Sequence, residues 1–163
     1  MLVLIAVGAC GQDAETQPEP PDGGATPDGS VAPVDGATDP RPDGAPATVC
    51  DEARLHSDFA WLQANVLTPS CATAMCHSGP DPEVGLSLAA GVAYANLVNK
   101  GASTVIGWVR VKPGSVALSY LAVALGRVAG PPPRDGFMPL GADPLCVEKL
   151  EAIERWITAG APQ

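Results

Sequence analysis

Apolar residues recur at helical spacing near the middle and at the end of this 163-residue chain. Leu55, Phe59, Leu62 and Val66 share one face, which predicts a helix over about residues 58–67, capped by Ser57 and ended by Thr68-Pro69. A second apolar stripe follows at the same spacing: Cys146, Leu150, Ile153 and Ile157. It predicts a helix with Asp143 as N-cap, Pro144 at the first helical position and Gly160 as terminator.

The stretch between these two helices predicts shorter elements and long connections. We expect a short helix over 90–98, an extended stretch over 104–111, and a helix that Ser115 caps and Gly126 ends. The prolines and glycines of 127–140 exclude regular structure there. The pattern predicts a mostly α-helical domain with long loops.

The N-terminal residues carry a different pattern. Residues 2–9 are apolar and end at Cys10, but as a helix they span about 12 Å against roughly 30 Å of bilayer core, so they do not cross a membrane. An apolar run of this length indicates an export signal. Val7-Gly8-Ala9-Cys10 resembles the lipobox of bacterial lipoproteins, which implies diacylation of Cys10 and a lipid anchor in the periplasm or at the outer membrane or cell surface. The alternative is a buried N-terminal strand.

Composition changes sharply after Cys10. Residues 11–49 hold eight acidic residues, one arginine, eight prolines and no aromatic residue, and they repeat Pro-Asp-Gly, which predicts a disordered tether. They lack the alternating acidic ligands of an EF-hand. Residues 50–163 hold all seven aromatic residues with ten acidic and eight basic residues, so we expect one folded domain there. The net charge of −9 argues against a nucleic-acid partner.

Three residues with ligand chemistry follow the first expected helix: Cys71, Cys76 and His77. In c-type haem attachment, two cysteine sulfurs form thioethers with the porphyrin vinyl groups, and a histidine directly after the second cysteine binds the iron. Adjacent Cys76 and His77 meet this requirement, although four residues separate the cysteines where two are usual. The sequence therefore predicts covalent haem c with His77 as proximal ligand.

A sixth ligand completes a low-spin haem of this kind, and a thioether suits the position because it is neutral and soft. Met138 lies in a proline-stiffened loop before the last helix and is the expected distal ligand. Met75 lies inside the attachment loop on the proximal side. His56, before the first helix, is the weaker competitor.

A series of short motifs runs through residues 55–161: Cys71-Ala-Thr-Ala-Met-Cys-His-Ser-Gly, Gly85-Leu-Ser-Leu, Tyr94-Ala-Asn-Leu-Val, Arg110-Val-Lys-Pro-Gly-Ser, Ser119-Tyr-Leu, Met138-Pro and Trp156-Ile-Thr-Ala-Gly-Ala. Their order resembles the cytochrome c-like domains of exported planctomycete and myxobacterial proteins. The resemblance implies a cytochrome c fold whose first and last helices cross beside the haem edge. It also implies attachment at Cys71 and Cys76, with His77 and Met138 as axial ligands.

These features predict a membrane-tethered monohaem electron carrier rather than an enzyme, with redox proteins as partners. Cysteine parity agrees: with Cys10 lipidated and Cys71 and Cys76 holding haem, Cys50 and Cys146 remain to close a disulfide. Without haem, the four cysteines of the domain allow three pairings.

Two alternatives stay open. In the first, the domain is a haem-free, disulfide-stabilised structural or interaction module at the cell surface, with Cys71 and Cys76 joined. In the second, zinc is held by Cys71, Cys76, His77 and a fourth residue, although adjacent Cys76 and His77 chelate one ion awkwardly.

Overall fold

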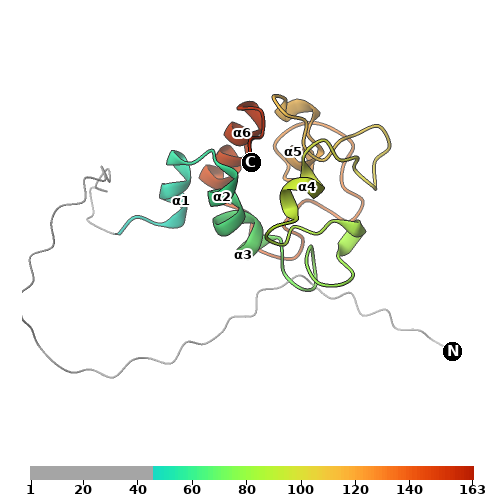
Figure 1. Ribbon diagram of the computed structural model, residues 1–163, viewed down its shortest axis with the longest axis horizontal. Helices are drawn as coiled ribbons and strands as arrows, with labels where there is room; N and C mark the ends of the chain where they lie inside the picture. Colours follow the sequence, from blue (N-terminus) through green and yellow to red (C-terminus); the bar gives the residue numbers. More distant parts are fainter. Residues whose placement is uncertain (1–45) are drawn as a thin grey trace, which may run out of the picture.

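The computed structural model describes residues 46–163, and within this range helices are the regular elements, with no strand (Figure 1). The prediction of a mostly helical domain is confirmed. The expected export signal, Cys10 and most of the expected tether lie outside the described residues. In chain order the helices are α1 (Val49–Glu52), η1 (Ala53–Leu55), α2 (Phe59–Leu62), η2 (Gln63–Leu67), α3 (Thr68–Ser70), η3 (Glu83–Gly85), α4 (Ala93–Leu97), η4 (Val116–Leu118), α5 (Tyr120–Ala124) and α6 (Val147–Thr158).

The first predicted helix is present but differs at both ends. Asp58 is its N-cap in place of Ser57, and its carboxylate accepts the Trp61 N–H at 2.8 Å. Helical backbone then runs through α2, the π-helical η2 and α3 as far as Ser70. Pro69 does not end the helix, since helical backbone continues through it to Ser70. Leu55 was expected on the apolar face, but it precedes the helix and is 80% exposed.

The last predicted helix begins later than expected. Cys146 is the N-cap of α6, with extended backbone, so Asp143 and Pro144 precede the helix. The predicted terminator is confirmed: Gly160 has φ 96° and its N–H donates to the Ile157 carbonyl at 3.0 Å. A φ in this region suits glycine, which lacks a Cβ.

The middle of the domain is less regular than predicted. The expected helix from Ser115 to Gly126 splits into η4 and α5 at Ser119, which is fully buried. The Ser119 hydroxyl accepts the Lys112 N–H at 2.9 Å and donates to the Ser115 carbonyl at 2.7 Å, so it ties this break to the preceding turn. The expected extended stretch over 104–111 forms turns and isolated bridges, including Val98 with Val111. Residues 127–140 lack regular structure, as predicted.

The core lies where α6 packs against the first helices of the domain, α1, η1 and α2 (Figure 1). Trp156 and Ile157 of α6 and Leu62 of α2 are almost completely buried there. The ring of Phe59 packs 5.3 Å from Trp156 and 5.2 Å from Tyr94, centroid to centroid, which joins α4 to the same core. Among residues 46–163, none of the helices has the length and apolar character that crossing a bilayer requires.

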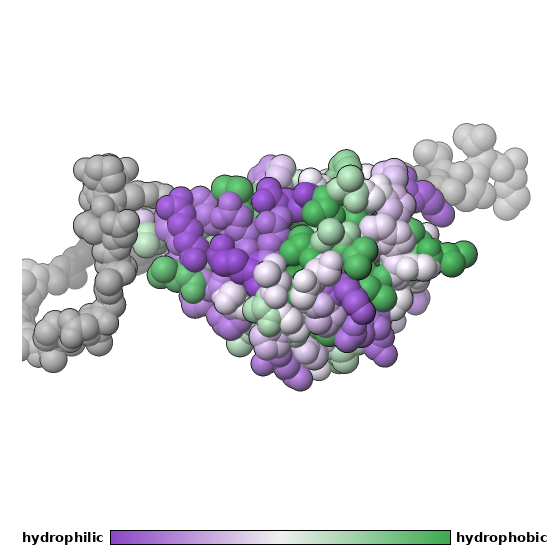
Figure 2. Space-filling model, turned by 90° about the horizontal axis from the view of Figure 1, so that it is seen from above, coloured by the Kyte–Doolittle hydropathy of each residue, from purple (hydrophilic) through white to green (hydrophobic). Residues whose placement is uncertain are grey.

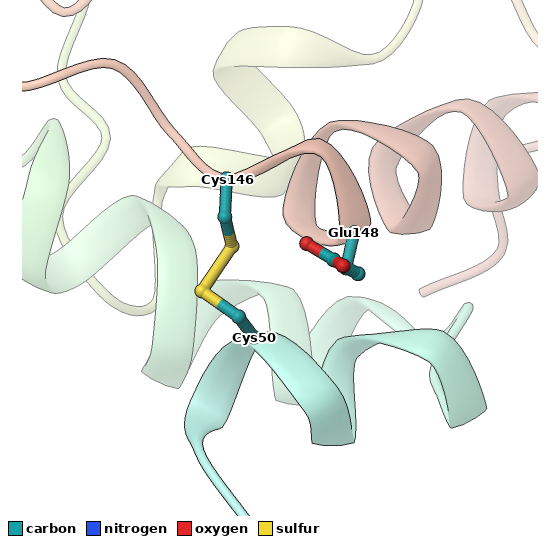
Figure 3. Close-up of side chains that lie close together, drawn as sticks. All are labelled: Cys50, Cys146 and Glu148. Carbon is teal, nitrogen blue, oxygen red and sulfur yellow. A yellow bond between two sulfur atoms is a disulfide. The ribbon is translucent and has the colours of Figure 1, made fainter.

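A disulfide fastens the two ends of the domain to each other. Cys50 of α1 and Cys146 before α6 are joined, with their Cα atoms 6.3 Å apart, as predicted (Figure 3). Arg54 reinforces the same contact, because its Nη2 lies 2.8 Å from the Glu148 carboxylate. Two further hydrogen bonds join Arg155 Nη2 to the carbonyls of Ala53 and His56, at 2.6 and 3.1 Å.

Candidate functional site

The segment from Cys71 to His77 forms a closed loop directly after α3. Cys71 is the C-cap of α3, and its N–H donates to the Leu67 carbonyl at 3.0 Å. The Cys71 carbonyl accepts the His77 N–H at 3.1 Å, which brings the two ends of the loop together. Inside the loop, the Cys76 N–H donates to the Thr73 carbonyl at 3.0 Å. The four residues between the cysteines are therefore accommodated as a compact turn.

The imidazole of His77 is buried, with 8% of the residue exposed, and its orientation is fixed by the backbone of the following segment. Nδ1 lies 3.2 Å from the Leu86 carbonyl oxygen. A carbonyl accepts and cannot donate, so this contact requires a proton on Nδ1 and leaves the lone pair of the neutral ring on Nε2. Histidine ligands of metals are commonly oriented in this way.

Burial lowers the pKa of His77. Hydrogen bonds to the Leu86 and Glu83 backbone and the charge of Glu83 raise this pKa, but they offset the effect of burial only in part. The ring is therefore held in its neutral, coordinating form at neutral pH.

A strained turn places the Leu86 carbonyl. Val84 and Gly85 both have positive φ, at 51° and 64°, and a β-branched residue such as Val84 rarely adopts this conformation. Three hydrogen bonds hold the turn: Glu83 N–H to Cys76 O, Leu88 N–H to His77 O and Ser103 Oγ to Val84 O. The turn and the Cys71–His77 loop thus form one hydrogen-bonded unit.

The two cysteines of the loop differ in state. Cys71 carries a free thiol, and burial raises its pKa to about 11, against which the charge of Lys149 acts weakly. Cys71 and Cys76 are therefore not joined to each other, and the pairing expected for the haem-free alternative is wrong in this structure. Cys76 is 8% exposed, and its sulfur is disulfide-bonded.

The other expected ligands lie on separate segments. Met138 is half-buried, and its N–H donates to the Ala124 carbonyl at 2.8 Å, which anchors the proline-rich loop to the end of α5. Within the described residues, no hydrogen bond joins Met138 to His77. Met75 is 70% exposed. His56 is already engaged, since its Nδ1 lies 2.9 Å from the Asp58 carboxylate and its ring stacks on Trp61.

The geometry does not favour zinc at the Cys71–His77 loop. In the described part of the chain, one group of three Cys, His, Asp or Glu side chains brings its ligand atoms within 4.8 Å of one another: Cys50, Cys146 and Glu148. Figure 3 shows that the two sulfurs of this group form the disulfide. Glu148 is paired with Arg54, whose Nη2 lies 2.8 Å from its carboxylate. Disulfide sulfurs are not thiolate ligands, so this group is structural.

Several apolar side chains of the loops and short turns that follow α3 are exposed. Seven of them are at least 39% exposed: Met75, Val84, Val92, Ile106, Leu118, Phe137 and Leu140. Figure 2 shows hydrophobic side chains gathered over the part of the domain away from α1, whereas hydrophilic ones cover the side of α1. Exposed apolar surface of this kind commonly marks a binding face.

Sequence reasoning found the loop but missed the groups that orient it. The Leu86 carbonyl and the Glu83 carbonyl are backbone acceptors, which no residue pattern specifies. Gly85 of the Gly85-Leu-Ser-Leu motif was a usable signal, because glycine readily adopts the positive φ, here 64°, that this turn requires. Gln63 was also missed: its Nε2 donates to the Leu88 carbonyl at 3.1 Å, which links η2 to the segment after His77.

No family model, curated protein or solved structure matches this chain.

Proposed function

We propose that residues 50–163 bind one covalent haem c and carry electrons between proteins. One observation carries the proposal: His77 is buried directly after Cys76, and the Leu86 carbonyl holds its Nδ1 so that Nε2 keeps the lone pair. The bond satisfies the buried Nδ1 donor and leaves the Nε2 lone pair available to a metal, as in many metal-ligating histidines.

The residue types of the site suit covalent attachment of a haem. Cys71 supplies a buried thiol at the end of α3, which would hold a porphyrin through a thioether, formed by addition of its S–H across a vinyl double bond without any external oxidant. Cys76 is the second proposed attachment point. An external dithiol would first have to reduce its disulfide, supplying two electrons and two protons, before the released thiol could hold the porphyrin in the same way. Met75 and Val84, which are exposed apolar residues of this hydrogen-bonded unit, are suited to contacting a large apolar ligand.

When bound, the haem would supply a one-electron couple between ferrous and ferric iron. His77 is the proposed proximal ligand and Met138 the proposed distal ligand. The neutral, soft thioether of Met138 would favour the ferrous form and would limit access of small molecules to the iron. The activity is therefore electron transfer to redox partner proteins and involves no catalysed reaction.

The proposed location follows from the N-terminal residues. Export, lipidation of Cys10 and a tether over 11–49 would keep the domain near a bacterial membrane, in the periplasm or at the cell surface. A flexible chain of 39 residues has a mean reach of about 35 Å, so the domain would approach partners near the membrane.

The deciding experiment is expression of the full chain in a bacterial host with cytochrome c maturation, followed by haem staining of a denaturing gel. We expect a stained band that the C71A/C76A variant loses. The C50A/C146A variant is the matched control, since it also removes two cysteines but should keep the stain. An unstained band from intact, folded wild-type protein would refute the haem proposal.

One observation favours the haem-free interaction module as a second candidate. The Cys76 sulfur is disulfide-bonded, which is incompatible with a thioether at the same atom. For this candidate we expect folded protein from the maturation-competent host to show no Soret band and to retain an oxidised Cys76, measured by mass spectrometry after alkylation.

A further inference from the structure

Arg110 differs from the other arginines that the structure describes. Four arginines of residues 46–163 lie within 4.0 Å of a carboxylate: Arg54 with Glu148, Arg127 with Glu154, Arg134 with Asp135 and Arg155 with Glu151. Within the same residues, no carboxylate pairs with Arg110. Its one side-chain hydrogen bond runs from Nη1 to the Asn96 carbonyl, at 2.9 Å. A guanidinium has five N–H donors, so most of those of Arg110 remain available.

The backbone around Arg110 is firmly held. Its N–H donates to the Lys100 carbonyl at 2.6 Å, and its carbonyl accepts the Leu121 N–H at 2.9 Å. The guanidinium is in turn anchored through Nη1 to the end of α4. The charge is therefore positioned before any ligand binds, which reduces the entropy lost on binding. Lys112, two residues along, is exposed.

Arg110 is half-buried, and burial alone lowers its pKa, with no opposing carboxylate. Removing a cation from water without a counter-charge costs free energy, which an anionic ligand recovers.

Hydrogen bonds connect Arg110 to the segment that holds His77. Asn96, whose carbonyl accepts from Arg110, donates through Nδ2 to the Ser87 carbonyl at 2.9 Å. Ser87 lies between Leu86 and Leu88, which both bond to His77. An anchored cation without a carboxylate partner among residues 46–163 is therefore joined to the segment that orients the proposed proximal ligand.

We propose that Arg110 is the anion-binding residue of the site and receives a carboxylate of the porphyrin, a propionate. This inference rests on the proposed function for the identity of the ligand. A guanidinium pairs with a carboxylate through two parallel N–H···O bonds, so Arg110 would fix the rotation of the porphyrin within the site as well as its charge.

The test uses the full chain purified without haem and two iron-free probes. Protoporphyrin IX carries two free propionates, whereas its dimethyl ester has the same ring without negative charge. Binding is followed by quenching of tryptophan fluorescence. We expect the wild type to bind the free acid roughly tenfold more tightly than the ester, as one charged hydrogen-bonded pair would give. R110Q should lose this preference, and R110K should retain part of it.

R134Q is the matched control, because Arg134 is 90% exposed and pairs only with its neighbour Asp135. It should bind both probes as the wild type does, and circular dichroism should show R110Q folded. The inference is overturned if R110Q keeps the full preference, or if the wild type does not distinguish the probes. Haem staining separates the two proposals. If wild-type protein stains for haem but R110Q keeps the full preference for the free acid, only the Arg110 site is refuted. If R110Q loses the preference but wild-type protein carries no covalent haem, only the electron-carrier proposal is refuted.

Discussion

At the scale of single residues, the site combines a neutral histidine, a buried thiol and an unpaired arginine. Each is unfavourable in isolation, since burial raises the pKa of Cys71 and lowers that of His77 and of Arg110. The spacing of Cys71, Cys76 and His77 in the sequence was sufficient to identify them as candidate haem-binding residues. Their protonation states were not, because burial and the Leu86 carbonyl, which lies nine residues from His77, determine them.

The distal ligand is testable by a single substitution. In haem-loaded protein we expect Met138→Ala to keep the covalent haem but to lose the low-spin visible spectrum and to lower the reduction potential, because a soft neutral ligand is removed. Met75→Ala is the matched control, since Met75 is 70% exposed. A Met138→Ala spectrum identical to that of the wild type would exclude Met138 as ligand.

Cys71 should make the stability of the haem-free protein depend on alkaline pH. Its pKa is about 11 in the folded state against 9.0 for an ordinary thiol, so the unfolded chain releases the proton first. The full contribution is present below pH 9 and is lost as the pH rises towards 11. We expect the free energy of unfolding to fall by about 2 to 3 kcal/mol over this range.

Urea denaturation at several pH values measures the effect of Cys71. The Cys71→Ala variant should lack this component of the alkaline decrease, whatever its stability at neutral pH. Parallel pH profiles for the two proteins would show that the thiol is not buried in the folded state.

At the scale of elements, periodicity located the helices, whereas local contacts decided their limits. Asp58 replaces Ser57 as the cap of α2 because its carboxylate reaches the Trp61 N–H. Cys146 replaces Asp143 as the cap of α6, since the disulfide to Cys50 fixes the backbone at that point. Buried Ser119 divides one predicted helix in two by bonding to the neighbouring turn.

The two candidate caps of α2 give opposite expectations. Asp58→Ala should lower the free energy of unfolding by about 1 kcal/mol, because the Trp61 N–H at the start of the helix loses its acceptor. Ser57→Ala should change it little. Thermal unfolding followed by circular dichroism distinguishes the variants, and a larger loss for Ser57→Ala would contradict the cap seen here.

The cap should also respond to acid. The pKa of Asp58 is lowered, first by its hydrogen bond with His56 and then by that with the Trp61 N–H. Its contribution is therefore complete above the ordinary carboxyl pKa and is lost as the pH falls through the lower folded value. Wild type and Asp58→Ala should accordingly converge in stability at acidic pH.

At the scale of the whole molecule, the disulfide joins the two ends of the domain, and long loops fill the space between them. Cys50 and Cys146 are 96 residues apart in sequence, so the bond restricts almost the entire unfolded domain. The C50S/C146S variant should lose roughly 3 to 5 kcal/mol of unfolding free energy in guanidinium titrations. Equal stability of the variant and the oxidised wild type would show that the ends are held by packing alone.

The sequence by itself determined the helical class and the candidate ligands, and it left the pairing of Cys50 with Cys146 as one of several possibilities that the structure decided. The class and the candidate ligands depend on residue type and short-range spacing, which are directly readable. Tertiary structure alone decided which carbonyl orients His77, that Arg110 lacks a carboxylate while Glu148 and Glu154 are paired, and which apolar side chains stay exposed. The reason is physical: hydrogen bonds to backbone atoms, ion pairs and burial depend on segments that meet only after the chain has folded.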